Sequence, residues 1–224
     1  MSEYMIHTCP KRKWYVDDFL IPSMLEQGIK HDCITVYNDV DEDGHLMAFM
    51  NSWKWLKDDG TWHMQDDIII SSDFARKTEV YDEGIVCGFV NSYSEYADET
   101  GYVPVEKMWY SMPCIRIPND IMKEMVVWFV TSGVQERYKS HIRNRKHSDV
   151  ILWDFLKERH AGMQVLHLAP NIINHIDHLI GGSLINEKRT KGPEEIMSLY
   201  WNEDCLITQL ENELDSYKIS HNML

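Results

Sequence analysis

The sequence has no run of about 18 apolar residues, so no transmembrane helix is predicted. The opening stretch MSEYMIHTCPKRK lacks the apolar core that a signal peptide places after its first charges. The five cysteines are widely spread and form no Cys-x-x-Cys pair, so neither a disulfide framework nor a structural zinc site is expected. These absences predict a cytoplasmic enzyme or binding domain with reduced thiols and no membrane partner.

Positive charge is also scarce, because 22 Lys and Arg residues face 36 Asp and Glu residues and the formal net charge is −14. Such a surface repels phosphates, which argues against general nucleic-acid binding. The exception is RYKSHIRNRKHSD, residues 137–149, where basic residues are concentrated. Either a solvated helix face or an anion-facing surface explains this basic run.

Hydrophobic patterning predicts alternating strands and helices in the first 70 residues. The strands are expected in EYMIHTCP, in CITVYNDV and after Trp62, and the helices around residues 19–25 and 46–56. This order is typical of a parallel sheet with crossover helices. The middle of the chain is β-rich, helices are expected from Ile121 and Ile151, and a last strand in QVLHLAP. We expect one α/β domain over residues 1–224, a mixed sheet flanked by helices, with residues 186–224 as a helical tail.

Two adjacent carboxylates, Asp66 and Asp67, interrupt the stretch WHMQDDIIISSDF, which otherwise has the pattern of a single strand. A buried strand does not tolerate two ionised groups unless something pairs with them. Neighbouring strand residues point to opposite faces, so one aspartate is expected to meet a ligand while the other is held by the protein. Carboxylates suit Mg²⁺ or Mn²⁺ together with substrate phosphates. The alternative is a pair of solvent-facing or capping aspartates just past a strand end.

A late segment, HLAPNIINHIDHLIGGSLI, adds His175 and His178 on either side of Asp177, followed by glycines. A neutral imidazole can complete a Mn²⁺ site begun by carboxylates. A glycine-rich turn lets backbone N–H groups approach phosphate oxygens. Taken alone, each histidine has the alternative of a surface or core position.

These motifs together resemble the nucleotide-sugar glycosyltransferases of the A-type fold (GT-A, Rossmann-like), and most of all the small phage and prophage enzymes. QDD is similar to their Asp-x-Asp strand, and PNIINHIDHLIGGSLI to their late Pro-x-Leu-Val-x-His-x-Gly-x-x-Ser-Ser segment. The resemblance covers about residues 4–185, and the stretches that match upstream of Asp66 are HTCPKRKWYV, QGIKHDCITVYND and GHLMAFMNSWKWL.

The resemblance implies a metal site and phosphate contacts. Asp67 would be the metal carboxylate and His175 the late metal ligand, with Asp66 contacting ribose or metal. Gly182 and Ser183 would contact the phosphates. Mn²⁺ or Mg²⁺ is the implied ion.

The resemblance also implies a nucleotide-binding loop after the first strand. Thr8, Pro10 and Arg12 would lie in it, and Arg12 would pair with a diphosphate or a base carbonyl. Asp39, after the second strand, would lie near the edge of the base. An exposed arginine after a strand is the simpler alternative for Arg12.

For the chemical step, the resemblance implies a general base at the start of a later helix. The matching stretch KHSDVILWDFLK offers Asp149, with Asp154 behind it. A helix N-cap explains Asp149 equally well. Trp109 would stack on a sugar face, or is a core residue.

The predicted function is therefore a metal-dependent hexosyl- or pentosyltransferase that moves a sugar from a nucleoside-diphosphate sugar to an unidentified hydroxyl, such as that of a modified DNA base. Gln65 and Asp177, which depart from the family pattern, favour the alternative of a non-catalytic nucleotide- or carbohydrate-binding protein. A nucleotidyltransferase would share the carboxylates.

Overall fold

The computed structural model describes residues 2–41, 44–56, 59–89, 99–107, 113–137, 148–181, 201–221 and 223. Its strands are β1 (Glu3–Thr8), β2 (Ile34–Asn38), β3 (Gly60–Gln65), β4 (Ile68–Ile70), β5 (Ile85–Cys87), β6 (Gly101–Pro104), β7 (Cys114–Pro118), β8 (Gln164–His167) and β9 (Ile173–His175). Its helices are α1 (Lys13–Tyr15), α2 (Ile21–Glu26), α3 (His45–Ser52), α4 (Phe74–Val80), α5 (Asn119–Thr131), α6 (Val134–Arg137), α8 (Ser148–Arg159) and α9 (Asp204–Ser220), with a π-helical segment η1 (Val16–Leu20) and the 3-10 turns η2 (His31–Cys33) and η3 (Trp53–Trp55).

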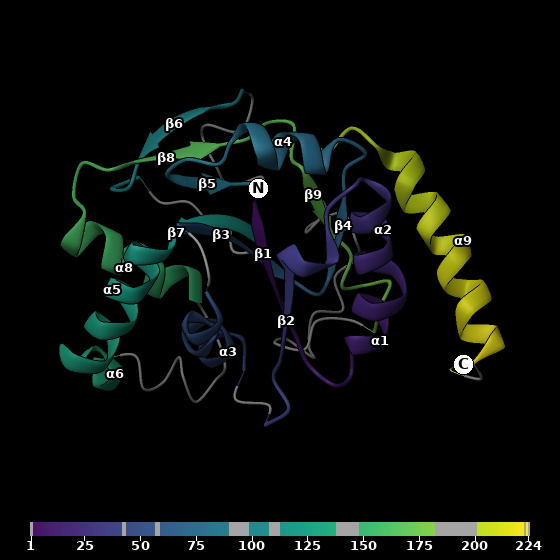
Figure 1. Cartoon of the computed structure of the whole chain (residues 1–224), viewed down its shortest axis with the longest axis horizontal. Coiled ribbons are helices and arrows are strands. Elements are labelled where there is room, and N and C mark those ends of the chain that lie inside the picture. Colours follow the sequence, from purple (N-terminus) through teal and green to yellow (C-terminus); the bar gives the residue numbers. More distant parts are fainter. Residues whose placement is uncertain are drawn as a thin grey trace.

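Seven strands form one mixed sheet in the order β2-β1-β3-β7-β5-β8-β6 (Figure 1). β1 pairs in parallel with both β2 and β3, as the strand–helix alternation predicts, and β7 is antiparallel to β3. A separate two-stranded sheet joins β4 to β9. The expected mixed α/β sheet flanked by helices is confirmed, and it brings the carboxyl ends of β1, β2 and β3 to one edge.

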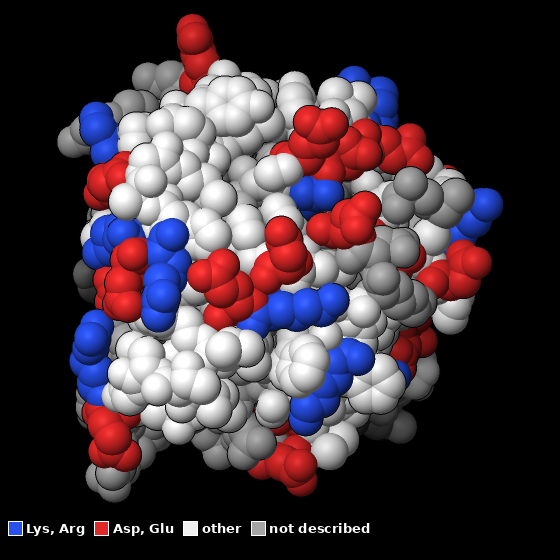
Figure 2. All heavy atoms as spheres, turned by 60° about the vertical axis from the view of Figure 1, so that its left-hand side comes forward, with Lys and Arg blue, Asp and Glu red and all other residues white. Residues whose placement is uncertain are grey.

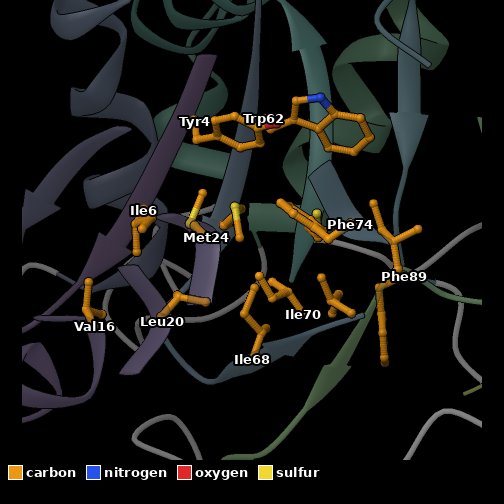
Figure 3. Packing of buried hydrophobic residues seen from close by; sticks show 14 of the residues in the cluster. Tyr4, Ile6, Val16, Leu20, Met24, Trp62, Ile68, Ile70, Phe74 and Phe89 are labelled. Carbon is orange, nitrogen blue, oxygen red and sulfur yellow. The ribbon is translucent and has the colours of Figure 1, made fainter. Parts of the chain in front are cut away.

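One face of the sheet packs on the first hydrophobic cluster (Figure 3). Tyr4 and Ile6 of β1 and Trp62 of β3 point into it and meet side chains from η1, α2, α4 and β4. The side chains labelled in Figure 3 are Tyr4, Ile6, Val16, Leu20, Met24, Trp62, Ile68, Ile70, Phe74 and Phe89. Leu210 and Leu214 place α9 against the same cluster.

The opposite face packs on the second cluster, which α3, α5 and α8 supply. Ile115 and Ile117 of β7 belong to it, whereas Cys114, the strand residue just before Ile115, belongs to the first cluster. Alternate residues of a strand point to opposite faces, so a sheet covered on both sides needs nearly continuous apolar strands. Burial on both faces explains why these strands read as apolar runs.

The two helices expected from Ile121 and Ile151 are confirmed as α5 and α8. α5 begins directly after Pro118, and its inward side chains recur with helical spacing: Ile121, Met122, Met125, Trp128 and Phe129 are all buried. α2 continues directly from η1 and has Pro22 in its first turn.

The expectation of a single strand through Asp66 and Asp67 is wrong. β3 ends at Gln65, and β4 begins at Ile68 in the other sheet. The chain turns at the two aspartates because their buried carboxylates need partners, and a ladder position would not provide them. β9, which carries His175 at its end, was not expected from the sequence.

None of the helices in the described part of the chain has the length and apolarity needed to cross a membrane. Figure 2 shows the side of the molecule that lies on the left in Figure 1. Lys and Arg are interleaved there with Asp, Glu and uncharged residues. Of the basic run, residues 138–147 lie outside the described residues.

Candidate functional site

The candidate site lies at the carboxyl ends of the parallel strands β1, β2 and β3. Thr8 ends β1, and the parallel register pairs its neighbour His7 with Gln65, the last residue of β3. The backbone N–H of Asp39, just after β2, donates to the carbonyl of Thr8 at 2.8 Å. Open α/β sheets bind ligands beyond this edge.

Arg12 connects the two aspartates. Its Nη1 donates to Asp66 Oδ1 at 3.0 Å and to Asp67 Oδ2 at 2.5 Å. The side chains of Arg12, Asp66 and Asp67 are only 4%, 10% and 12% exposed. A turn in which the Arg12 N–H donates to the Cys9 carbonyl at 3.0 Å directs the arginine back toward β3. Both carboxylates therefore face the same cation, which corrects the expectation that they point to opposite sides of a strand.

The environments of the two aspartates push their pKa values apart. Burial, together with the neighbouring Asp67, raises the pKa of Asp66 even though Arg12 opposes the change. Thr8 Oγ1 donates to Asp66 Oδ2 at 2.9 Å and fixes the orientation of this carboxylate. For Asp67 the cost of burial is outweighed by the charges of His175 and Arg12, which hold the pKa of Asp67 well below its usual range.

His175 reaches Asp67 through the pairing of β4 with β9. The register sets Ile68 opposite His175, and the N–H of Ile176 donates to the Asp67 carbonyl at 2.8 Å. His175 Nε2 then lies 3.3 Å from Asp67 Oδ2, and Nδ1 lies 3.6 Å from Asp177 Oδ1. Burial favours the neutral ring, but the charge of Asp67 and the contacts with both aspartates raise the pKa of His175 well above its usual value.

The Asp67–His175 pair has the chemistry of a divalent-cation site. Asp67 Oδ1 is buried and accepts no hydrogen bond within the described residues. Neighbouring ligands of an octahedral ion with bonds of about 2.1 Å lie about 3 Å apart, close to the 3.3 Å between Asp67 Oδ2 and His175 Nε2. Over the described ranges no group of three or more His, Cys, Asp or Glu side chains is placed to hold a metal. An ion bound at this pair would therefore take two ligands from the described residues and complete its shell with water and phosphate.

α9 supports both sides of this site, a contribution that the sequence did not signal. Lys218 Nζ donates to the Leu179 carbonyl at 2.9 Å, shortly after β9. Its neighbour Tyr217 donates to Asp18 Oδ2 at 2.6 Å and stacks on Trp14, two residues after Arg12. The tail helix therefore contacts the two segments that supply His175 and Arg12.

Asp177 is the residue whose role the sequence interpretation missed. It departs from the family pattern, and for that reason it counted for a degenerate site. In the structure it is buried, and its Oδ1 lies 3.6 Å from His175 Nδ1, which is an ion-pair distance and too long for a hydrogen bond. A carboxylate on the second nitrogen of a histidine is the usual arrangement around a ligating imidazole. The His-x-Asp spacing was the only available signal.

Two further residues of the predicted nucleotide site lie at this edge without contacting the aspartate pair in the contacts described. Asp39 Oδ2 accepts from the N–H of Gly44 at 2.8 Å, at the start of α3. Pro10 is exposed in the turn before Arg12. Gly182, Ser183 and Trp109 lie outside the described residues.

The two candidate bases lie on α8, which packs against α3 and α5. Asp149 Oδ1 accepts from the N–H of Val150 at 2.9 Å in the first turn of the helix. Asp154 forms an ion pair with Lys157 at 2.9 Å. Figure 1 shows α8 and the β4–β9 pair on opposite sides of β3. The structure does not bring Asp149 or Asp154 into contact with the aspartate pair.

No protein-family model and no curated protein matches this sequence. Among solved structures, the inositol-1-phosphate CTP transferase of T. maritima is similar over 96% of both chains, at 10% identity and a TM-score of 0.45. A Drosophila β-1,4-galactosyltransferase 7 mutant, in complex with manganese, UDP-Gal and xylobiose, is 12% identical, with a TM-score of 0.42 over 91% of this chain and 73% of that one. The protein A197 from STIV is 12% identical, with a TM-score of 0.45 over 78% and 85%. These likenesses are distant and carry no assignment of activity.

Proposed function

We propose that this protein is a divalent-cation-dependent glycosyltransferase that moves a sugar from a nucleoside-diphosphate sugar to a hydroxyl acceptor. The observation that carries the proposal is the contact of Asp67 with His175 at the carboxyl edge of three parallel strands, where Asp67 Oδ1 accepts no hydrogen bond from the described residues. A carboxylate and an imidazole brought together there have the chemistry that Mn²⁺ or Mg²⁺ requires.

In this proposal Asp67 and His175 would hold the cation, His175 giving up its ring proton to solvent as it ligates. When bound, the cation neutralises the charge that develops on the departing nucleoside diphosphate. Asp177 faces the other nitrogen of His175 and keeps Nε2 directed at the site. Thr8 holds Asp66, which is free to turn its second oxygen toward ribose once Arg12 leaves it. The Arg12 guanidinium supplies a planar fork of donors for phosphate oxygens.

The acceptor hydroxyl needs a base that takes its proton as the sugar is transferred. Asp149 at the start of α8 is proposed for this role, with Asp154 as the second candidate. The acceptor itself is proposed only as a hydroxyl compound. If it is a modified base in DNA, binding must weaken steeply as salt rises, because neutralised phosphates release counterions. A carbohydrate or small-molecule acceptor would show little dependence on salt.

A non-catalytic nucleotide-binding protein is the second candidate. The specific observation in its favour is that Arg12 and His175 already place two cationic side chains on the Asp67 carboxylate. A protein of this kind would bind a nucleotide without any divalent ion.

Thermal unfolding with UDP, GDP, TDP or CDP, each with and without Mn²⁺, separates the two candidates. A ligand that binds only the native state increases the free energy of unfolding, by about 2.7 kcal/mol at a hundred times its Kd, and so raises the melting temperature. We expect a rise that needs both Mn²⁺ and one nucleotide, that is lost in Asp67→Asn and that persists in Asp17→Asn. Asp17 is the control because it is an exposed aspartate in a surface ion pair.

The second step of the test identifies the reaction. The matching nucleotide sugar is incubated with Mn²⁺ and a panel of hydroxyl acceptors, and the released nucleotide is separated by chromatography. Release of the nucleoside diphosphate supports glycosyl transfer. In a parallel incubation with a nucleoside triphosphate and a sugar phosphate, release of pyrophosphate identifies a nucleotidyltransferase. A melting shift that needs no Mn²⁺, with no nucleotide released, would refute the transferase and leave the binding protein.

A further inference from the structure

The geometry points to Arg12 as a built-in counter-ion of the aspartate pair. Arg12 leaves Asp67, and a divalent cation binds there, only when phosphate oxygens accept hydrogen bonds from the guanidinium. The inference rests on the proposed function and deepens it. It states that cation and nucleoside diphosphate bind cooperatively, and it names the residue that couples them.

The first observation is that one nitrogen of Arg12 serves both carboxylates. Nη1 lies 3.0 Å from Asp66 Oδ1 and 2.5 Å from Asp67 Oδ2, in a side chain that is 4% exposed. The same Asp67 Oδ2 faces His175 Nε2 at 3.3 Å. The oxygen that a cation would share with His175 is therefore already covered by a guanidinium.

A divalent cation at this oxygen would lie within a few ångströms of the guanidinium charge. Two like charges at that distance repel strongly where little water screens them. The cation therefore has to displace Arg12, and displacement would leave a buried guanidinium without carboxylates, which is costly unless a new anion receives it. Cation binding in the absence of any other ligand is opposed by both effects.

A diphosphate removes this obstacle. Guanidinium groups pair with phosphate oxygens through the same planar fork that they use for carboxylates. Arg12 follows β1 in a turn whose preceding residues, Pro10 and Lys11, are exposed, so the turn that carries Arg12 lies at the protein surface. Because linkage is reciprocal, a nucleotide that draws Arg12 away strengthens cation binding, and the cation strengthens nucleotide binding by the same factor.

The test measures Mn²⁺ binding directly, by electron paramagnetic resonance of the free ion, on the full chain. The variants are Arg12→Met, which keeps an unbranched side chain as far as the ε position and removes the charged guanidinium, and Lys13→Met as the matched control. Lys13 is the adjacent basic residue, and its ion pair with Asp17 is exposed. Each protein is titrated with Mn²⁺ alone and with Mn²⁺ plus the nucleoside diphosphate that stabilises the wild type.

We expect Arg12→Met to bind Mn²⁺ alone at least tenfold more tightly than the wild type, and Lys13→Met to be unchanged. The nucleotide should strengthen Mn²⁺ binding to the wild type by a larger factor than to Arg12→Met. Equal or weaker binding of Mn²⁺ alone by Arg12→Met would overturn the inference.

Loss of Arg12 leaves two buried carboxylates without their shared cation, so Arg12→Met is paired with the double variant Arg12→Met/Asp66→Asn. The double variant removes one charge of each sign and keeps Asp67 and His175, and it should show the same gain in Mn²⁺ affinity. If the variants bind Mn²⁺ more tightly but no nucleotide changes Mn²⁺ binding in any of these proteins, the counter-ion role stands and the transferase is refuted. Nucleotide-dependent Mn²⁺ binding that is equal in the wild type and both variants refutes the counter-ion role of Arg12 and leaves the transferase standing.

Discussion

Replacing Arg12 with methionine should lower the free energy of unfolding by about 3 kcal/mol in the absence of metal and nucleotide. Breaking a buried ion pair by removing one partner costs about 3 to 5 kcal/mol, because the remaining charge stays buried without compensation. Here one guanidinium serves two carboxylates that are only 10% and 12% exposed. The lower end of the range applies because Asp66 keeps its hydrogen bond from Thr8 and Asp67 keeps His175.

The assay is urea unfolding followed by circular dichroism at pH 7.5 with a chelator present. Arg12→Met/Asp66→Asn should recover at least half of the loss, since it removes one of the two uncompensated charges. Lys13→Met is the control, and its exposed pair with Asp17 should cost less than about 1 kcal/mol. If Arg12→Met unfolds within 1 kcal/mol of Lys13→Met, which is about the scale of a surface pair, the buried ion network does not exist as described.

Burial lowers the pKa of His167 to about 4, so below about pH 6.5 the unfolded chain binds a proton that the native state does not. The free energy of unfolding therefore falls by up to about 3 kcal/mol as the pH drops from 6.5 toward 4. Urea unfolding at pH 7.5 and 5 should show a smaller fall for His167→Gln than for the wild type, and equal falls would contradict the assignment. Gly88→Ala should cost about 1 to 3 kcal/mol, because its new Cβ would lie 2.8 Å from two atoms of Ile172, whereas Gly101→Ala meets, among the described residues, only a backbone oxygen at 4.0 Å. Equal melting temperatures for the two variants would show that the core around Gly88 is looser than described. Asp149→Asn should lower kcat for sugar transfer by about 10² to 10⁴ and leave the nucleotide-dependent melting shift intact, and full activity would remove Asp149 from the mechanism.

Local pattern was sufficient to predict much of the fold. The apolar runs of β1 and β2 and the helical spacing of α5 are short-range properties, and the strand–helix alternation of the first 70 residues correctly indicated parallel pairing of β1, β2 and β3. The length of β3 was not predictable in this way. Ile68, Ile69 and Ile70 continue its apolar pattern, yet they pair with β9, whose residues lie about a hundred positions further along.

By itself the sequence determined which residues were candidates for a site: the aspartate pair, the late histidine and the arginine after the first strand. Residue type and spacing are sufficient for that, because carboxylates inside an apolar stretch demand partners. Only the tertiary structure decided which partners they have. The Arg12–Asp66 contact spans 54 positions, and His175 reaches Asp67 because β4 leaves the large sheet to pair with β9. Such contacts depend on strand register and on which opposite charges lie beside the buried ones, and neither can be predicted from a local sequence pattern.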